Sequence, residues 1–356
     1  MTPAVEPANG IRSHKFRVEK DSVLVSMLNP RIPRVWFAQG SRNALASTEF
    51  AVLRPIDLRI GLAFLYCLCR SSNFASMLDE RSTGTTGSRK RSKAADALAF
   101  TFSLPPLSVQ ERIAEIIGAV DDEITALDTE SRALTMVLRR RRADLATDDS
   151  IEAVRAEQAF DFSTGVRRTP DRATGPYMTP YLRSANVGYG TLDLSDVLEM
   201  NYDPSERKKF ALRYGDVLVS EGSASANAVG MPAMWRDELP GPVCTQMTLL
   251  RLRALEEICI PEFVFHWCMW AYESRAFLDI AGGTNIKHIS AKRAKGMTVR
   301  LPSLDRQREI AAELDAMESA LKAVRAEATH LREVRASLLS GLLDRTIDIE
   351  SAELGV

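Results

Sequence analysis

Two long heptad patterns dominate the hydrophobic profile of this chain. In each, apolar residues recur at alternating steps of four and three, and corresponding positions lie 197 residues apart. A heptad pattern held over about four repeats predicts coiled-coil helices. The matched patterns favour pairing within the chain over the alternative, a single amphipathic helix on a globular core. The predicted seam consists of Ile113, Ile117, Val120, Ile124, Leu127, Leu134 and Leu138 in the first helix and Ile310, Leu314, Met317, Leu321, Val324, Leu331 and Leu338 in the second.

Each heptad pattern follows the same opening, Leu-Pro-x-Leu-x-x-Gln-x-x-Ile-Ala, which begins at Leu104 and again at Leu301. The prolines favour an extended entry into the helix. Ser108 with Glu111 predicts a capping box, and Asp305 is the predicted N-cap of the second helix. Each helix would extend about 54 Å at ~1.5 Å per residue.

The segment before each helix reads as a mixed α/β arm. In the first arm, 23–26, 35–38, 50–53 and 97–103 are predicted strands, and 59–70 and 73–79 are predicted helices. In the second arm, the strands 216–220 and 248–252 and the helix 261–272 correspond to elements of the first. The second arm has about sixty additional residues before its Val-Leu-Val-Ser strand, so we expect the first arm to lack its front half.

These patterns predict an α+β fold with two mixed arms, the first incomplete, and two long helices that form an antiparallel coiled coil. The expected boundaries are a disordered lead-in at 1–20, a truncated first arm at 21–103 and the first long helix at 104–150. The second arm follows at 151–300, the second long helix at 301–346 and a tail at 347–356.

Composition restricts the class of protein. The chain has 356 residues, is 45% hydrophobic and has a formal net charge of -1, so any nucleic-acid binding must come from local patches. Its five scattered cysteines show no zinc-ligand spacing and are expected to be buried, reduced thiols of a cytoplasmic protein. No apolar run is long enough to span a membrane.

The two Leu-Pro-x-Leu-x-x-Gln openings, the heptads behind them and the strand 215–219 resemble the specificity subunit of type I restriction–modification systems. Segments Thr83–Thr86 and Gly282–Asn285 also match. The resemblance implies that each arm is a target recognition domain that reads half of a bipartite DNA site, and that the helices hold the arms apart. It also implies a non-catalytic chain whose partners are double-stranded DNA, modification (methyltransferase) subunits and a restriction/translocase subunit. S-adenosylmethionine, ATP and Mg would bind to those subunits, and this chain would hold no cofactor.

The candidate DNA-binding residues lie mainly in two loops that are rich in basic residues and lack acids, 81–93 and 281–295. Lys and Arg contact phosphates, whereas Asn and Arg can read base edges. The alternative is a solvated surface loop. The candidates are Thr85, Thr86, Ser88, Arg89, Lys90 and Arg91 in the first arm, and Arg183, Asn186, Ser223, Ser225, Asn227, Asn285, Lys287, His288, Ser290 and Lys292 in the second.

Arg139–Arg142, near the end of the first long helix, either complement the helix dipole or face DNA between the half-sites. Helices of this length predict half-site centres roughly one to one and a half turns apart, at ~34 Å per turn.

Catalytic signatures are missing from the sequence. Gly84–Lys90 has the wrong spacing for a P-loop, and no Asn/Asp-Pro-Pro-aromatic motif of an adenine methyltransferase occurs. His266 lies in an apolar run and reads as a core histidine. The leading hypothesis is therefore a DNA-recognition subunit with no active or metal site of its own. The rivals are a coiled-coil scaffold that binds only protein, a specificity subunit that no longer reads one half-site, and a methyltransferase fused to recognition arms.

Overall fold

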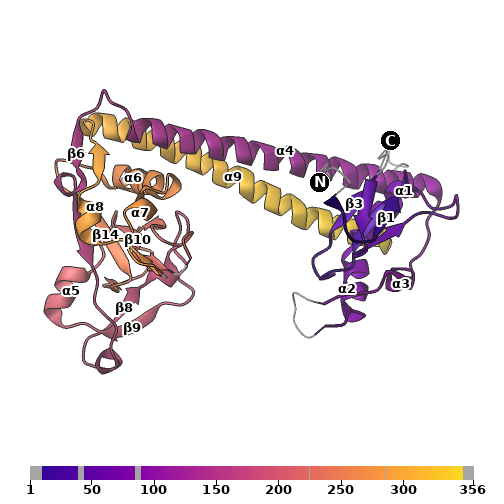
Figure 1. Cartoon of the computed structure of the whole chain (residues 1–356), viewed down its shortest axis with the longest axis horizontal. Helices are drawn as coiled ribbons and strands as arrows, with labels where there is room; N and C mark the ends of the chain where they lie inside the picture. Colours follow the sequence, from indigo (N-terminus) through magenta and orange to yellow (C-terminus); the bar gives the residue numbers. More distant parts are fainter. Residues whose placement is uncertain (1–9, 39–43, 85–89, 224, 285, 348–356) are drawn as a thin grey trace. The chain divides into compact units, whose positions relative to one another are not determined.

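The computed structural model describes residues 10–38, 44–84, 90–223, 225–284 and 286–347 (Figure 1). The chain divides into two compact units. The first unit contains the first arm, the first part of the first long helix to Glu130, and the last part of the second from Val324. The second unit runs from Ser131 to Ala323 and contains the second arm.

The first arm is built on the three-stranded antiparallel sheet β3-β2-β5, formed by Val35–Phe37, Val23–Ser26 and Phe50–Leu53. One face packs on helices α1 (Leu62–Cys69), α2 (Ser72–Glu80) and α3 (Ala94–Ala97). The other face is covered by the two-stranded sheet of β1 (Lys15–Val18) and β4 (Ala44–Ser47). Val23, Leu24 and Val25 are buried, because the central strand is covered on both faces.

The second arm contains a four-stranded sheet of order β12-β10-β14-β7, formed by Pro232–Met234, Val217–Ser220, Leu249–Ala254 and Phe160–Thr164. Helix α6 (Pro261–Glu273), with α7 (Ala276–Asp279) and α8 (Ala291–Lys295), covers one face. The other elements are β6 (Ala153–Arg155), η2 (Ala156–Gln158), η3 (Pro170–Arg172), β8 (Met178–Leu182), η4 (Ser184–Asn186), β9 (Leu198–Asn201), α5 (Pro204–Phe210), β11 (Gly222–Ser223), β13 (Cys244–Thr245), β15 (Lys287–His288) and β16 (Thr298–Arg300).

The two long helices are α4 (Leu107–Ala146) and α9 (Leu304–Leu343), each of 40 residues (Figure 1). In the first unit Asp121 binds Arg335 at 2.6 Å and Asp128 binds Arg332 at 2.6 Å, so the helices are antiparallel. In the second unit the seam residues Leu138, Ile310, Leu314 and Leu321 form one buried cluster. All residues of the predicted seam are buried or half-buried.

A buried glutamine explains the repeated helix opening. Gln110 accepts from the backbone N–H of Gly61 at 2.8 Å and donates to the carbonyls of Arg59 and Pro105, each at 2.8 Å. Gln307 accepts from the N–H of Ile260 at 3.0 Å and donates to the carbonyls of Ile258 at 3.0 Å and Pro302 at 2.9 Å. Each glutamine therefore ties the start of a long helix to the loop that leads into the main helix of its arm. A buried amide with all these bonds made is stabilising and directional.

Both predicted helix caps are wrong by two residues. Helix α4 begins at Leu107, before Ser108, so Ser108 and Glu111 lie inside the helix and form no capping box. Helix α9 begins at Leu304, and the Ser303 hydroxyl accepts from the N–H of Arg306 at 3.4 Å. Asp305 therefore lies in the first turn, where a carboxylate favours the positive end of the helix dipole.

Two predictions for the first arm are also corrected. Residues 15–18 of the expected disordered lead-in form β1, because Lys15–Val18 pairs with Ala44–Ser47. Residues 98–103 form no strand. Their counterpart in the second arm, β16, is a strand because it pairs with β6, and no described segment of the first arm corresponds to β6.

Candidate DNA interface

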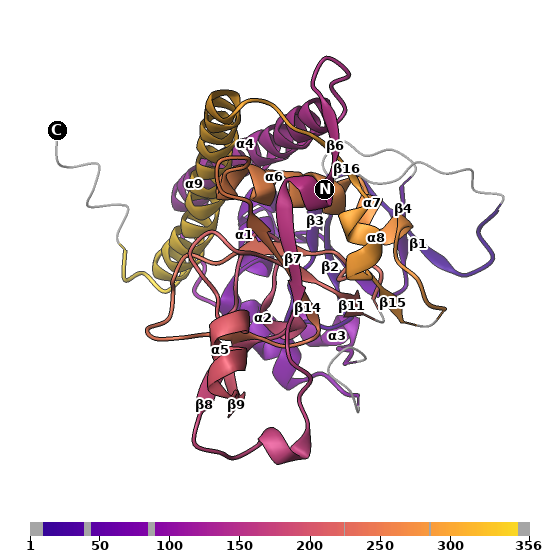
Figure 2. The same cartoon turned by 90° about the vertical axis from the view of Figure 1, so that its left-hand side faces the viewer.

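Several loops of the second arm meet at one end of its sheet, which we call the loop end. The backbone N–H of Glu221 donates to Thr248 at 2.9 Å, and the carbonyl of Glu221 accepts from Ile289 at 2.8 Å. The Ser184 hydroxyl donates to the carbonyl of Thr248 at 2.6 Å. Strand β11 pairs with β15 (Figure 2). The loop end therefore comprises the described residues 165–168, 183–186, 221–223, 225–229, 246–248, 281–284 and 286–292, segments that are far apart in the sequence.

The two candidate lysines of the loop end project from this region without acidic partners. Lys287 is half-buried and its backbone pairs with that of Ser223 in the β11–β15 ladder. Lys292 is exposed on α8. Among the described residues, neither lysine is part of an ion pair. Their charges are therefore available to a phosphate, which is the usual partner of lysine on a duplex.

The remaining candidates of this region differ in their placement. His288 is exposed, with Nδ1 3.6 Å from Glu221 Oε2. Ser290 caps α8, since its hydroxyl accepts from the N–H of Arg293 at 3.3 Å. Ser225 and Asn227 are exposed in the turn after β11, and the carbonyl of Asn227 accepts from the Tyr272 hydroxyl at 2.6 Å. Asn285 lies outside the described residues.

Arg183 and Asn186 serve the fold of their own turn. Asn186 is 2% exposed; its side chain accepts from the N–H of Arg183 at 3.0 Å and donates to the carbonyls of Asp193 at 2.9 Å and Asp196 at 3.1 Å. With these bonds made inside the protein, the amide does not face a ligand, which corrects the expectation of a base-reading asparagine. Arg183 binds Asp196 at 2.5 Å.

Residues 85–89 of the basic loop of the first arm lie outside the described residues, and this applies to Thr85, Thr86, Ser88 and Arg89. Lys90 Nζ lies 3.5 Å from Asp79 Oδ1. Arg91 binds Glu49 at 2.6 Å and forms backbone bridges to Leu28 and Thr83. Both cations therefore have an acidic partner within the arm, unlike Lys287 and Lys292.

Arg167 and Arg168 were missed by sequence reasoning. Both are exposed and follow Val166, which is bonded to Thr245 at 3.0 Å and Met247 at 3.0 Å beside Thr248. Gly165 allows this approach, because a Cβ there would lie 1.9 Å from the Thr245 carbonyl oxygen. The adjacent arginines were a visible signal, but only the fold brings them to the loop end.

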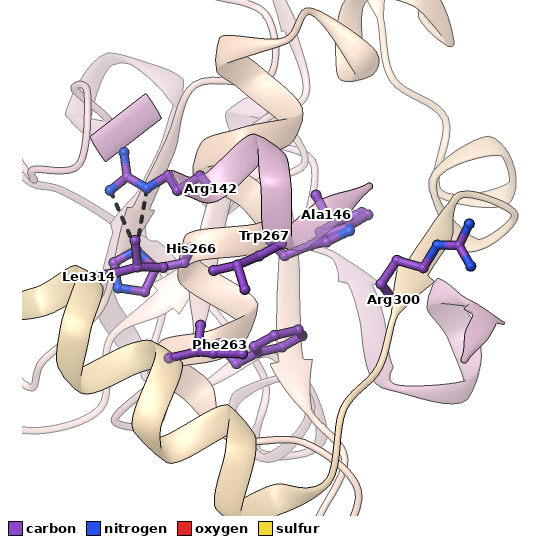
Figure 3. A pocket seen from close by; sticks show the side chains of 9 residues that line it. Arg142, Ala146, Phe263, His266, Trp267, Arg300 and Leu314 are labelled. Carbon is purple, nitrogen blue, oxygen red and sulfur yellow. Dashed lines mark hydrogen bonds between the residues drawn. The ribbon is translucent and has the colours of Figure 1, made fainter. Parts of the chain in front are cut away.

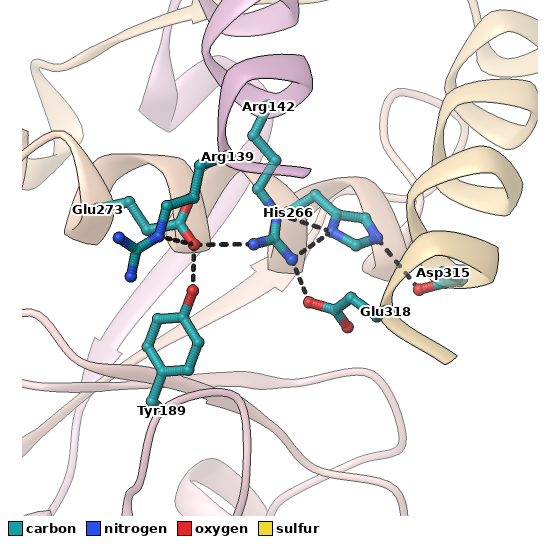
Figure 4. A network of polar contacts seen from close by, with 7 residues as sticks. All are labelled: Arg139, Arg142, Tyr189, His266, Glu273, Asp315 and Glu318. Carbon is teal, nitrogen blue, oxygen red and sulfur yellow. Dashed lines mark hydrogen bonds and ion pairs between the residues drawn. The ribbon is translucent and has the colours of Figure 1, made fainter. Parts of the chain in front are cut away.

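The four arginines of α4 bind acids within the second unit, and Figure 4 shows two of them, Arg139 and Arg142. Arg142 is 2% exposed; it donates to Glu273 at 2.9 Å, to Glu318, and to His266 Nδ1 at 3.4 Å. The other three pair with Glu273 (Arg139), Asp144 (Arg140) and Glu313 (Arg141). Arg142 therefore joins α4 to α6 and α9, an arrangement that neither sequence-based alternative anticipated.

His266 is confirmed as a core histidine. It is 3% exposed, and its Nε2 lies 3.1 Å from Asp315 Oδ1. Because Nδ1 accepts from Arg142, Nε2 carries the proton and donates it to Asp315. This hydrogen bond holds the pKa of Asp315 below its usual value.

A small cavity of about 20 Å³ lies at this junction, lined by Arg142, Phe263, His266, Trp267 and Leu314 among others (Figure 3). That volume suits roughly one water molecule, so the cavity is too small for a cofactor.

The five cysteines are buried and free. Burial raises the pKa of Cys67 to about 11 and those of Cys69, Cys244 and Cys259 to about 12. The thiols are therefore protonated and packed in cores, as predicted.

Comparison with known proteins shows which family this chain matches. The family described as "Type I restriction modification DNA specificity domain" matches residues 10–135 and 160–329, more than half of the chain. No helix of the described segments has the length and hydropathy needed to cross a membrane.

Two solved structures share the fold at low sequence identity. One, from work on complex assembly and conformational transition of the type I R-M system, is 17% identical with a TM-score of 0.62, over 94% of this chain and 84% of the other. The type-I restriction-modification system S subunit from M. genitalium is 15% identical with a TM-score of 0.53, over 92% of this chain and 84% of its own.

Proposed function

Because this chain belongs to the type I restriction modification DNA specificity family, we propose that it binds duplex DNA through the loop end of its second arm. The observation that carries this proposal is the gathering of Arg167, Arg168, Lys287 and Lys292 at loops that meet around Thr248 and Glu221. Four cations at one end of the arm suit a phosphate backbone even though the whole chain is nearly neutral.

The chain would act without an active site of its own. The second arm would read one half of a bipartite site, and the paired helices would set the spacing to the other half. Methylation and cleavage would belong to modification and restriction subunits that dock on this chain, and S-adenosylmethionine, ATP and Mg would bind there.

The test is the salt dependence of binding to a mixed-sequence duplex. Lys287→Glu with Lys292→Glu should weaken binding across all sequences and flatten the slope of log K against log salt by about one per lost phosphate contact. Lys322→Glu, which alters an exposed lysine of α9, is the matched control and should leave the slope unchanged. Equal affinity of the double variant and the parent at low salt would remove these residues from the interface. Complete absence of salt-dependent binding by the parent would favour the protein-binding scaffold.

A second candidate is a specificity subunit that reads one half-site only. It is favoured by the first arm, whose described residues include no counterpart of β6 to β9. In the second arm, Arg167 and Arg168 lie in the segment that follows β7.

A further inference from the structure

The sheets of the two arms can be aligned strand by strand. Val23 pairs with Leu53 in the first arm, and Val217 pairs with Leu252 in the second. Val52 therefore stands at the position of Arg251, and Arg54 at that of Arg253. The strand order β3-β2-β5 of the first arm corresponds to β12-β10-β14 of the second, and β7 of the second arm has no counterpart among the described strands of the first. In the described part of the first arm, β5 is consequently an edge strand.

The backbone direction shows which groups this edge presents. In the second arm the backbone N–H of Leu255 donates to the carbonyl of Ala159 at 3.0 Å. Because the hydrogen bonds of an antiparallel ladder alternate along a strand, the backbone N–H and C=O groups of Arg253 and Arg251 also face β7. By correspondence, the peptide groups of Val52 and Arg54 point away from the first sheet, as an open edge requires.

A second segment of the first arm is unpaired at the same place. In the second arm one continuous segment, 153–164, pairs with two partners: β6 with β16, and β7 with β14 (Figure 2). It is also bonded between them, since Ala156 N–H donates to Met297 at 2.8 Å. In the first arm both partners are present, as β5 and the non-strand residues 101–103.

The surface around this edge is apolar. Ile56, Leu58 and Leu98 are 103%, 96% and 79% exposed. A groove of about 330 Å³ is lined by Ile56, Leu98, Val52 and Leu53, with Arg17, Glu19 and Arg54 at its polar side. Large aliphatic side chains left this exposed next to an open strand mark a protein-binding surface.

We propose that this groove binds an extended segment of another polypeptide with the pattern of residues 153–164: a short strand, a helical turn, and a strand with aromatic residues at alternate positions. The segment adds a strand to β5 and a second to residues 101–103. A second copy of this chain, paired through its own β5, leaves residues 101–103 unpaired, so it fits less well. The proposal goes beyond DNA recognition and does not depend on it.

The experiment uses the full chain and a fluorescent peptide of residues 153–165, followed by anisotropy. We expect saturable binding that Ile56→Asp with Leu98→Asp weakens by about tenfold or more. Met136→Asp, at an exposed residue of α4, should leave binding unchanged. Circular dichroism checks that each variant folds.

The peptide itself supplies a test that leaves the protein unaltered. N-methylation of Ser163, whose N–H faces the ladder, should abolish binding, whereas N-methylation of Phe162, whose N–H faces away, should not. No saturable binding, or equal binding of the two N-methylated peptides, would overturn the proposal. So would a dimer of the parent, seen by sedimentation, that Ile56→Asp with Leu98→Asp dissociates, because a second copy would then cover the groove.

Discussion

Arg142 and Leu339 occupy the same position of the repeat but have different surroundings. Leu339 is 1% exposed in an apolar cluster with Phe64 and Cys67 of α1. Arg142, equally buried, lies among Glu273, Glu318 and His266. At this position the second arm is held to the long helices by a buried ionic network and the first arm by apolar contacts. The first arm has its own ion pair to α4 elsewhere, between Arg70 and Asp121. A buried ionic network is directional, but each charge in it depends on its partner.

Arg142→Leu should destabilise the chain by about 3–5 kcal/mol, because it leaves the Glu273 carboxylate buried without its main partner. Chemical unfolding followed by circular dichroism measures this. Arg140→Leu is the matched control: its side chain is 80% exposed, and its pair with Asp144 contributes only about 0.3–0.5 kcal/mol. Adding Glu273→Gln to Arg142→Leu should recover part of the loss; if Arg142→Leu unfolds like Arg140→Leu, the network does not hold the junction.

Acid should also destabilise the second unit, through two carboxylates of α9, Glu313 and Asp315. The hydrogen bonds from His266 and Arg141 lower the pKa values of Asp315 and Glu313. A lowered folded-state pKa means that the stabilisation is present above the unfolded value, about 3.9–4.3, and is lost as pH falls through the folded value. The thermal midpoint should thus vary little between about pH 7 and 5 on account of these two groups and fall below about pH 4. Arg141→Gln should reduce that fall; an identical acid profile would exclude Glu313 as a contributor.

At the scale of elements, the long helices depend on their seam, and the arms depend on the glutamines that anchor the helix starts. Leu314 and Leu321 are 1% and 7% exposed in the cluster formed with Leu138 and Ile310. The seam is interrupted by polar pairs such as Asp121 with Arg335, which fix the register of the two helices.

Leu314→Asp with Leu321→Asp should cost several kcal/mol, since two carboxylates enter an apolar seam without partners. Thermal melting followed by helical circular dichroism measures the effect. Ala316→Asp with Ala323→Asp, at exposed positions of the same helix, is the control and should cost about 1 kcal/mol, mostly through helix propensity. Equal melting of the two double variants would contradict the coiled-coil seam.

At the scale of the whole molecule, the described residues of the two arms differ: the second arm contains β6 to β9, which have no counterpart in the first. The described first arm has the central sheet and its helices, whereas the elements that bring Arg167 and Arg168 to the loop end occur in the second arm. Phosphate contact and base discrimination are thus expected to be unequal between the arms.

In a cell whose only specificity chain is this one, methylation by the assembled enzyme should depend on the bases of one half-site and tolerate changes at the other. Methylome sequencing measures this directly. Two fully specified half-sites would contradict the expectation. The same measurement can be repeated in a strain that also expresses a peptide of residues 153–165. If base dependence then appears at the second half-site, the first arm lacked only this segment; if it does not, the first arm does not read DNA.

The sequence by itself determined the α+β class, the two-fold repeat and the heptad seam, because these features are periodic and each residue's environment follows from its neighbours a few positions away. Only the tertiary structure decided what depends on partners distant in sequence. Asn186 is a buried turn residue because it bonds to Asp193 and Asp196. Arg139, Arg141 and Arg142 bind acids of α6 and α9, which the fold brings to α4. Residues 298–300 formed a strand while 101–103 did not, although their sequences correspond, because a strand exists only where another segment supplies its hydrogen bonds.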